Sequence, residues 1–428
     1  MLLISQTFYP DITAVGQMMT DLAEDLSKKG IEITVICGKN KKNSPARETY
    51  KGIRIERVDV LKLNKQIIPF RYLNYLSFFP SVLLKAIFIP KPDLIFIVSY
   101  PPFMYLLGYC IKIIRRTKMV INIQDLFPDV AVKLKLLKSP LLIKILEELT
   151  LYIYKRADLI ICIGETMGNL LIKKGVKISN LKIIHNWADG KQLYPIEKKD
   201  NPFISNHNLS NKFIVQYSGN FGMAHEIDTI LEAAKEMSNH KDILFLFIGN
   251  GMQYDKIYSF ICDNNLHNIL LLALQPRSAL NFSLNASDVS LVTIKDGLEG
   301  TLVPSKIYGI MASAKAILSI CNFNSEIVNI INESNCGMVI KPGESHSLVN
   351  AILLLYKNEA IRKSMGQNGR VHFLAKFERS IGTLQYFYEL NNLLIKKIPA
   401  AIGGGKPMAD EGAKEGSIDK KIPQAVVN

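Results

Sequence analysis

Residues 292–321 read VTIKDGLEGTLVPSKIYGIMASAKAILSIC, and this stretch decides the fold. A β-rich run over residues 289–294 leads into a loop, 295–304, that holds two glycines and a proline. From Ser305 onward apolar residues recur at helical spacing, and 316–320 then form a continuous apolar run typical of a buried strand. The sequence therefore predicts a strand, a glycine loop, a helix and a second strand, the unit of a parallel α/β sheet.

The start of this predicted helix carries a serine and a lysine. Ser305 is suited to cap the helix, while Lys306 lies in the first turn, where the helix dipole disfavours a positive charge. Unpaired amides at a helix start attract phosphate, and a lysine beside them suits a bound anion. A surface lysine on a packed βαβ unit explains these residues equally well, so the anion site is a hypothesis.

Other loops of the C-terminal half also follow predicted strands. Gly219 and Asn220 follow one strand, Gly249 follows the next, and Arg277 and Gly300 follow the two after that. Because the carboxyl ends of parallel strands meet at one edge of a sheet, we expect these residues to lie close together. Glycine loops that converge at one edge predict a phosphate site more strongly than any single loop does.

The N-terminal half opens with a strand over 1–5, a loop with Gly16, a helix over 18–29 and a strand over 31–37. This spacing implies parallel strands joined by a right-handed crossover. Gly16 lies in a loop that could approach a ligand closely, although a glycine there is also common for turn geometry alone.

Two aspartates follow the predicted strand over 118–124. Asp125 comes directly after it, and Asp129 lies four residues further on. A carboxylate at the carboxyl end of a parallel strand faces the ligand crevice and can act as a general base. We expect Asp125 to have this role, while Asp129 could face an acceptor or cap the next helix.

Composition indicates a globular protein of two or three domains, since 428 residues are 48% apolar and 21% charged. Residues 1–189 hold 28 Lys and Arg against 16 Asp and Glu, within a net charge of +14 for the whole chain. A basic half suits phosphorylated substrates or an anionic membrane surface. No zinc-finger spacing, RNP-like aromatic pattern or basic zipper supports nucleic-acid binding. Six widely spaced cysteines in or beside apolar runs predict buried free thiols.

Two apolar segments bear on a membrane. Residues 94–111 carry no charge, but the central Tyr-Pro-Pro favours a buried strand, a loop and a helix over a membrane span. Residues 61–90 mix aromatic and aliphatic side chains with the four cations Lys62, Lys65, Arg71 and Lys85. A helix at a membrane interface and an ordinary buried helix pair fit this second segment equally well. The N-terminus lacks a basic leader, so no signal peptide is expected.

Compositional breaks predict the domain boundaries. Residues 1–190 form the first α/β unit, 191–212 are polar without periodicity as in a linker, and 213–375 form the second unit. Residues 376–397 are predicted to be helical and could return to the first domain. Residues 398–428 lack an apolar stripe, include three consecutive glycines and are expected to be disordered.

The segment VPSKIYGIMASAKAIL, residues 303–318, resembles the C-terminal domain of glycosyltransferase family four, which comprises retaining sugar transferases with the GT-B fold. The likeness is greatest to the subgroup of O-antigen, capsule and colanic-acid synthesis, which includes fucosaminyltransferase-like proteins. It covers roughly residues 1–395. It implies two Rossmann-like parallel-sheet domains that face a central cleft, the first binding the acceptor and the second the nucleotide sugar.

The resemblance also implies roles for individual residues. The family's donor-phosphate loop corresponds to the loop of Gly219 and Asn220, with Asn220 where an arginine is often found. Glu299 matches the first of two family glutamates, while the second aligns with Gly309. Glu299 would meet the donor sugar or the acceptor, and the glutamate missing at position 309 puts the usual ribose contact in doubt.

On the acceptor side, the family often has a histidine and an acid at the end of the strand over 118–124. Gln124 occupies the place of the histidine, so the candidate base is Asp125. The family's first loop, here the loop of Gly16, faces the cleft between the domains. Lys306, and Arg277 with it, could replace the missing cations of the phosphate loop.

The reaction implied by the resemblance is the transfer of a sugar, such as N-acetylfucosamine, from a nucleotide-diphosphate donor, with UDP the first choice. It needs no cofactor and no metal, and the sequence has no DxD-type motif at a strand end. The acceptor would be a polyprenyl-diphosphate-linked saccharide. The protein would then be cytoplasmic and bound peripherally to the inner membrane, which favours the membrane interpretation of residues 61–90.

Two other functions remain open. A non-catalytic nucleotide-binding protein fits the loss of the second glutamate and of the loop cations. A nucleotide-sugar epimerase of the same architecture is the other alternative, although it leaves the basic aromatic segment 61–90 unexplained. A transfer assay and product analysis without acceptor distinguish the three.

Overall fold

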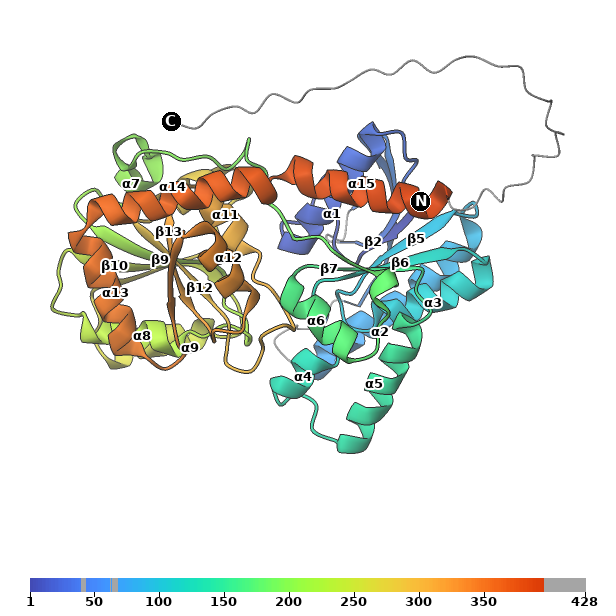
Figure 1. Ribbon diagram of the computed structural model, residues 1–428, viewed down its shortest axis with the longest axis horizontal. Helices are drawn as coiled ribbons and strands as arrows, with labels where there is room; N and C mark the ends of the chain where they lie inside the picture. Colours follow the sequence, from blue (N-terminus) through green and yellow to red (C-terminus); the bar gives the residue numbers. More distant parts are fainter. Residues whose placement is uncertain (40–43, 62, 64–67, 396–428) are drawn as a thin grey trace, which may run out of the picture.

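The computed structural model describes residues 1–39, 44–61, 63 and 68–395. Two α/β domains lie side by side, each built on one sheet with helices on both faces (Figure 1). The tail over 398–428, with the last residues of the segment over 376–397, lies outside the described residues, as do Lys62 and Lys65.

The N-terminal sheet has eight strands in the order β3-β4-β2-β1-β5-β6-β7-β8. Neighbouring strands in this sheet are parallel, except for β3 and β4. These two strands form an antiparallel hairpin at the edge, which turns through Lys51 and Gly52, both at positive φ. The strands are β1 Leu2–Ile4, β2 Thr34–Gly38, β3 Arg47–Tyr50, β4 Ile53–Val58, β5 Leu94–Val98, β6 Lys118–Ile123, β7 Leu159–Cys162 and β8 Leu181–Ile183.

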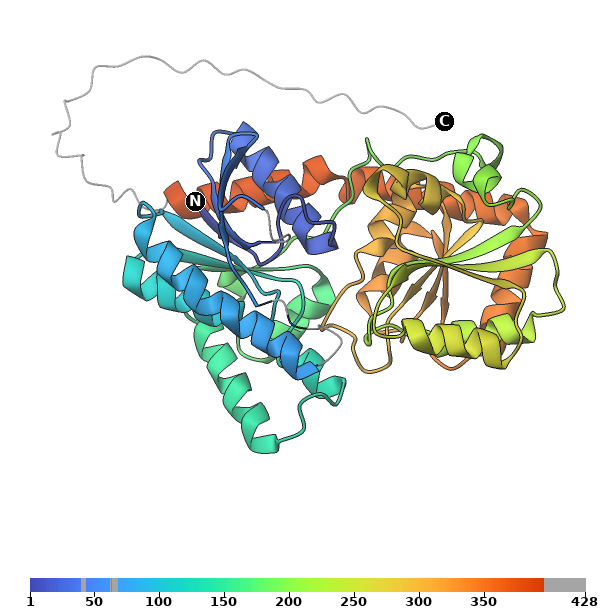
Figure 2. The same ribbon diagram turned by 180° about the vertical axis from the view of Figure 1, so that it is seen from behind.

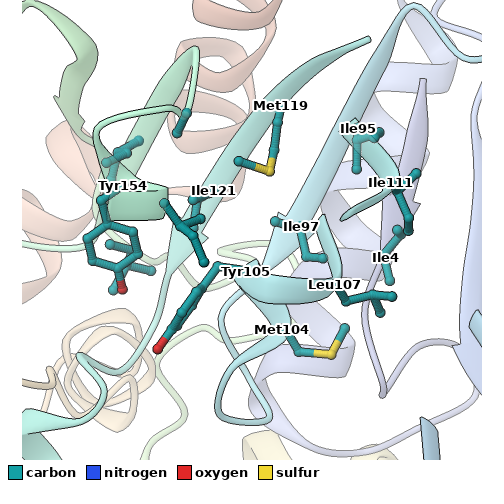
Figure 3. Packing of buried hydrophobic residues seen from close by; sticks show 14 of the residues in the cluster. Ile4, Ile95, Ile97, Met104, Tyr105, Leu107, Ile111, Met119, Ile121 and Tyr154 are labelled. Carbon is teal, nitrogen blue, oxygen red and sulfur yellow. The ribbon is translucent and has the colours of Figure 1, made fainter. Parts of the chain in front are cut away.

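Helices cover both faces of this sheet. They are α1 Ala14–Lys28, α2 Ile68–Phe88, α3 Met104–Arg115, α4 Asp129–Lys133, α5 Pro140–Tyr154, α6 Glu165–Lys173 and the final helix α15 Arg379–Ile395. Alternate residues of β5 serve the two faces of the sheet. Ile95 and Ile97 pack with α2, α3 and α5, in a cluster of which Figure 3 shows a part. Phe96 packs on the other face with α1 and α15. Residues 94–111 are thus a buried strand and a helix, as predicted. No helix in the described part of the chain has the length and apolar character needed to cross a bilayer.

The C-terminal sheet has six parallel strands in the order β11-β10-β9-β12-β13-β14. The strands are β9 Phe213–Asn220, β10 Ile243–Asn250, β11 Ile269–Leu272, β12 Val289–Thr293, β13 Ala316–Ile320 and β14 Gly337–Ile340. The helices are α7 Pro202–Asn206, α8 Asp228–Glu236, α9 Tyr254–Asp263, α10 Leu280–Asn285, α11 Lys306–Ala312, α12 Glu326–Ser334, α13 Ser345–Lys357 and α14 Glu359–Lys376, and three 3₁₀ turns span Ile178–Asn180, Lys198–Asp200 and Arg277–Ala279. The strand, loop, helix and strand predicted from residues 292–321 are β12, the following loop, α11 and β13.

The segment predicted as a linker, 191–212, is more ordered than its polar composition indicated. Asn201 caps α7 by accepting a hydrogen bond from the Phe203 amide, and Pro202 is the first helical residue. Phe203 and Leu209 are buried against the C-terminal sheet. Most of this segment therefore belongs to the C-terminal domain.

The last helix, α15, crosses back to the N-terminal domain, where it packs on α1 (Figure 1). Tyr386 and Leu390 are fully buried in the N-terminal core beside Trp187. At the start of the helix, the Arg379 guanidinium contacts Asp21 and Asp25 of α1, each at 2.8 Å.

The six cysteines are free thiols, as expected, but two are not buried. Cys110 lies on the outward side of α3 and Cys262 on the outward side of α9, so both are exposed. The apolar runs that contain them are amphipathic helices, and a run of apolar letters does not show which side of a helix faces water.

Candidate active site between the two domains

The side chain of Lys306 ends in an unpaired buried ammonium. Its Nζ is shielded from solvent, donates no hydrogen bond to any described residue and lies 3.5 Å from the centroid of the Tyr217 ring. Burial holds the pKa of Lys306 well below its usual range. A buried amine without a counter-charge is costly, so this arrangement fits a lysine that waits for an anionic ligand.

Lys306 lies against the carboxyl end of β9, where Gly219 and Asn220 are the last two residues of the strand. The prediction that these two residues, and Gly249 of β10, follow their strands is therefore wrong, because both strands extend through their glycines in paired register. A side-chain carbon added to Gly219 would stand 3.5 Å from the lysine Cε and 3.6 Å from its Nζ, and Gly219 has a φ of +124°. Gly249, its partner in β10, packs so closely that an added carbon would lie 1.9 Å from the Gly219 carbonyl oxygen. The ends of these two strands and the lysine therefore leave room only for backbone, and Asn220, the last residue of β9, is exposed.

A half-buried histidine lies near this lysine. The Nδ1 atom of His225 lies 3.0 Å from the carbonyl oxygen of Thr293. Burial, with the nearby charge of Lys306, lowers the pKa of His225 to about 3. His225 is therefore neutral at physiological pH, and Lys306 is the cation that the geometry provides at these strand ends.

Asp125 lies where the two domains touch. It pairs with Leu302 in an antiparallel bridge, and the amide of Leu126 donates to the carbonyl oxygen of Thr301 at 2.8 Å. The Asp125 side chain is half-buried, and no described residue donates a hydrogen bond to its carboxylate. Burial raises the pKa of Asp125 to about 6, a value suited to a general base near neutral pH.

Gln124, the residue in the place of the family histidine, is part of a buried amide network. Its Nε2 donates to the Asn122 Oδ1 at 2.7 Å, and its Oε1 accepts from the Asn186 Nδ2 at 2.9 Å. Asn122 in turn donates to the hydroxyl of Tyr386 at 2.6 Å. Gln124 therefore connects β6 with the segment before the linker and with α15, and its amide does not act as a base.

The chain itself limits the distance between the two halves of this site. Lys306 comes four positions after Leu302, so their Cα atoms lie within about 14 Å of each other. Bridged residues such as Asp125 and Leu302 have Cα atoms roughly 5 Å apart. The candidate base and the candidate anion-binding lysine therefore flank one short loop.

Glu299 and Ser305 lie on this same loop. The Glu299 carboxylate accepts a hydrogen bond from the Gly297 amide at 3.3 Å and stays partly exposed, while its carbonyl oxygen accepts from Lys133 of α4 at 3.4 Å. Ser305 has the N-cap position of α11, but its hydroxyl makes no capping hydrogen bond. Because α11 has only seven residues, Lys306 carries more of the case for an anion site than the helix dipole does.

Three other predicted residues lie apart from Lys306. Arg277 is exposed and donates to the Oε1 of Gln192, in the segment that joins the domains, at 3.2 Å. Asp129 is the first residue of α4 and pairs with Lys174, the residue that follows α6, at 2.8 Å, so it does not cap the helix. Gly16 lies in the first turn of α1, where its amide donates to the Thr13 hydroxyl at 3.3 Å.

Sequence reasoning missed Glu326, the first residue of α12. Its carboxylate is 2% exposed, and its Oε2 accepts from both the amide and the hydroxyl of Thr166, each at 2.9 Å. Glu326 follows β13 by six residues, at the same sheet edge as the predicted site. A search for carboxylates after every strand of the C-terminal sheet would have included it.

Comparison with known proteins agrees with this geometry. Solved structures that share the fold include sucrose-phosphate synthase from Thermosynechococcus elongatus, with a TM-score of 0.74 and 17% identity over 92% of this chain and 99% of that one. Anabaena Alr3699/HepE in complex with UDP and glucose gives a TM-score of 0.71 and 14% identity over 91% of this chain and 99% of that one. Two parallel-sheet domains arranged in this way define the GT-B fold.

Residues 15–191 match the family described as Glycosyltransferase Family 4, and residues 198–372 match Glycosyl transferases group 1. The chain therefore belongs to the family-four glycosyltransferases. The "Probable glycosyltransferase WbjE" of Pseudomonas aeruginosa is 32% identical over 257 residues, 60% of this chain and 62% of that relative, so less than two thirds of its length is covered. The "Putative colanic acid biosynthesis glycosyl transferase WcaI" of Escherichia coli (strain K12) is 24% identical over 84% of this chain and 93% of its own.

Proposed function

We propose that this chain transfers a sugar from a nucleotide-diphosphate donor to a polyprenyl-diphosphate-linked acceptor during the synthesis of a bacterial surface polysaccharide. The observation that carries the proposal is the buried, unpaired ammonium of Lys306 against Gly219. A diphosphate seated there would supply the missing counter-charge, and Lys306 would offset the charge of the leaving nucleotide. Anabaena HepE, a solved structure of the same fold, was captured with UDP and with UDP-glucose, which makes UDP the first donor to test.

The acceptor hydroxyl would enter from the N-terminal domain. Asp125 would accept its proton, because its carboxylate is unpaired, lies at the contact between the domains and has a raised pKa. Glu299 lies three positions before Leu302, the residue that pairs with Asp125, and would face the donor sugar. We propose retention of the anomeric configuration and no metal requirement, both from the family resemblance.

Sugar identity is the finest part of the proposal. The likeness to the O-antigen, capsule and colanic-acid subgroup suggests an N-acetylated deoxyhexosamine such as N-acetylfucosamine. A panel of UDP-, GDP- and dTDP-sugars tests the donor, since a ligand that binds the native state raises the melting temperature. Incubation of the best donor with a polyprenyl-diphosphate-linked saccharide should then yield a lengthened lipid whose new linkage has the donor's anomeric configuration.

Three outcomes would exclude the proposal. Binding without transfer to any lipid-linked acceptor indicates the non-catalytic alternative. Conversion of the donor sugar without acceptor indicates an epimerase. Inversion of the anomeric centre, or loss of activity with EDTA that Mg²⁺ restores, would remove the retaining or metal-independent part of the assignment.

We also propose that the protein binds the inner face of the plasma membrane through α2, α3 and α5. These helices form one layer on the N-terminal domain, where α3 contacts both α2 and α5 (Figure 2). The inner side of α2 is core, with Phe78, Val82 and Ala86 fully buried. Its outer side is exposed and apolar, and this is the side that we propose faces the bilayer.

The outer side of this layer carries many exposed apolar residues. Exposed apolar side chains of this layer include Leu73, Leu76, Leu84 and Phe88 of α2, Ile113 and Ile114 of α3, and Leu141, Leu142, Ile145 and Leu149 of α5. α5 extends from the body of the domain, and none of its residues before Thr150 is buried (Figure 1). Residues 60–124 hold nine Lys and Arg against one acid, so an anionic bilayer is the partner with complementary charge.

Vesicle sedimentation tests this surface. The protein should bind vesicles of phosphatidylglycerol and phosphatidylcholine more tightly than vesicles of phosphatidylcholine alone. The double variant Leu142→Glu and Ile145→Glu should weaken that binding at least roughly tenfold, because two apolar side chains are lost from the interface. Val371→Glu, at an equally exposed apolar residue of α14, is the control. Equal binding of both variants would exclude α5 from the membrane contact.

A further inference from the structure

The carboxylate of Glu326 is bound by the opposite domain. Glu326 begins α12 of the C-terminal domain, but both hydrogen bonds to its Oε2 come from Thr166 of the N-terminal domain. Its other oxygen faces His185, also of the N-terminal domain, with 3.9 Å between Oε1 and Nδ1. Among the described residues, neither lysine nor arginine pairs with this buried carboxylate.

Neutral donors hold this charge. Burial lowers the pKa of His185, and its ring packs edge-on against Phe377 with centroids 5.2 Å apart. The imidazole is therefore uncharged near neutral pH and lies beyond hydrogen-bond distance. Glu326 is thus stabilised mainly by the amide and hydroxyl of Thr166, which it can reach only when the two domains are in this arrangement.

The amide of Thr166 belongs to the first turn of α6, a nine-residue helix. Gly164 has the N-cap position of α6 and offers no side chain to cap it. Glu326 therefore caps a helix of the other domain, and its negative charge also suits the positive end of the helix dipole. Gly164 has an extended backbone that any residue can adopt, but an added carbon would lie 2.6 Å from the Cδ of Glu326. The glycine is required there because Glu326 needs the space.

The same turn of α6 also receives the loop of the candidate site. An added carbon on Gly300 would lie 3.2 Å from the carbonyl oxygen of Thr166. Two residues further along, Leu302 pairs with Asp125. Thr166 is therefore contacted both by Glu326 and by the loop that leads to Lys306, so that capping of α6 fixes this loop against the end of β6.

We propose that Glu326 is a positioning residue: by capping α6 across the cleft, it holds the acceptor and donor halves of the site in register. The latch, defined as Glu326, Thr166 and Gly164, aligns Asp125 with Lys306. Its effect on the transfer rate rests on the proposed function, whereas its effect on the domain arrangement does not.

The two exposed cysteines give a direct test in the intact chain. Cys110 lies in the N-terminal domain and Cys262 in the C-terminal domain, and the other four cysteines are buried. Nitroxide labels on these two thiols report the distance between the domains by pulsed electron paramagnetic resonance. The wild type should give one narrow distribution, and Glu326→Gln, Thr166→Val and Gly164→Ala should each add a second distance as the ratio of latched to open molecules falls roughly tenfold.

Two controls separate the latch from loss of fold or charge. Thr166→Ser keeps both donors and should keep the wild-type distance. Glu333→Gln removes the same charge from the same helix, but Glu333 pairs with Lys376 inside the C-terminal domain, so it should also leave the distance unchanged. The three latch variants alter different atoms. If one of them fails to fold, the other two still show whether the latch holds the domains in this arrangement. Wild-type distances in all folded latch variants would overturn the proposal.

Kinetics give a second readout. Glu326→Gln should lower kcat roughly tenfold while the Kd for UDP stays within about twofold, since the residues placed at the phosphate site all belong to the C-terminal domain. Equal losses in UDP binding and turnover would indicate a local structural role instead. If no sugar transfer is found with any donor, the proposed function fails, but the distance measurement still decides the latch.

Discussion

Replacement of Lys306 by methionine should change stability and nucleotide affinity in opposite directions. Methionine keeps the length of the side chain and removes an ammonium that has no hydrogen-bond partner among the described residues. An unsatisfied buried polar group costs about 1–3 kcal/mol. Only below the lowered pKa of Lys306, where the side chain is charged, does loss of its contact with the Tyr217 ring offset about 0.5–2 kcal/mol of this gain. At pH values above that lowered pKa, the free energy of unfolding of the unliganded protein should therefore rise by about 1–3 kcal/mol.

Affinity should fall in the same variant. A hydrogen bond to a charged group contributes about 1.5–3 kcal/mol, which corresponds to a roughly 10- to 150-fold increase in the Kd for UDP. At a UDP concentration of 100 times the wild-type Kd, bound ligand stabilises the wild type by about 2.7 kcal/mol. The same concentration should stabilise Lys306→Met by only about 0.3–1.4 kcal/mol.

Calorimetry measures both effects. Scanning calorimetry with and without UDP gives the two stabilities, and titration in buffers of different ionisation enthalpy counts protons. Since burial lowers the pKa of Lys306 in the free protein and a bound diphosphate would raise it, UDP binding should take up a proton at pH values between these two pKa values. Lys306→Met should lose that uptake.

Lys315→Met is the matched control, because burial also lowers the pKa of Lys315, to about 8, but this lysine lies just before β13, at the amino end of the strand. It should leave the Kd for UDP unchanged. The reasoning is refuted if Lys306→Met binds UDP as tightly as the wild type. It is also refuted if Lys306→Met is destabilised as strongly as an ordinary core variant and Lys315→Met weakens UDP binding as much as Lys306→Met does.

Two further predictions concern the acceptor side and the crossing helix. Asp125→Asn should lower kcat by about 10²- to 10⁴-fold without lowering the melting temperature; in the wild type, kcat/KM for the acceptor should rise with pH to a plateau above about pH 6, because the base must be unprotonated. The free energy of unfolding should change with pH in the opposite direction. Because the folded pKa of Asp125 is about 6 and the unfolded value is 3.8, this residue lowers the free energy of unfolding as pH rises from 3.8 to 6. A pH profile that is flat across this range would remove Asp125 as the base. Tyr386→Phe should lower the free energy of unfolding by about 1–3 kcal/mol, because the buried Asn122 amide loses its acceptor; urea denaturation measures this, and an unchanged midpoint would contradict it.

The parts of the site that follow strand ends could be predicted from sequence. Periodicity placed β12, α11 and β13, and the loop between them identified Lys306, because local patterns determine where a parallel strand ends. The contact of Glu326 with Thr166 joins residues 160 positions apart, and the sequence around each is unremarkable on its own. Gln124 could be read only as a missing histidine, since its network depends on Asn186 and Tyr386, which come together only in the folded chain.

The return of α15 has a consequence for the order of events during synthesis. Tyr386 and Leu390 fill the interior of the first domain, and Arg379 neutralises the acidic side of α1. When only the first half of the chain has emerged from the ribosome, the core of the N-terminal domain therefore still lacks the side chains of α15. The nascent N-terminal half should close only after the rest has emerged, and a chain cut before position 379 should leave that half prone to aggregation even with every residue of its own sheet present.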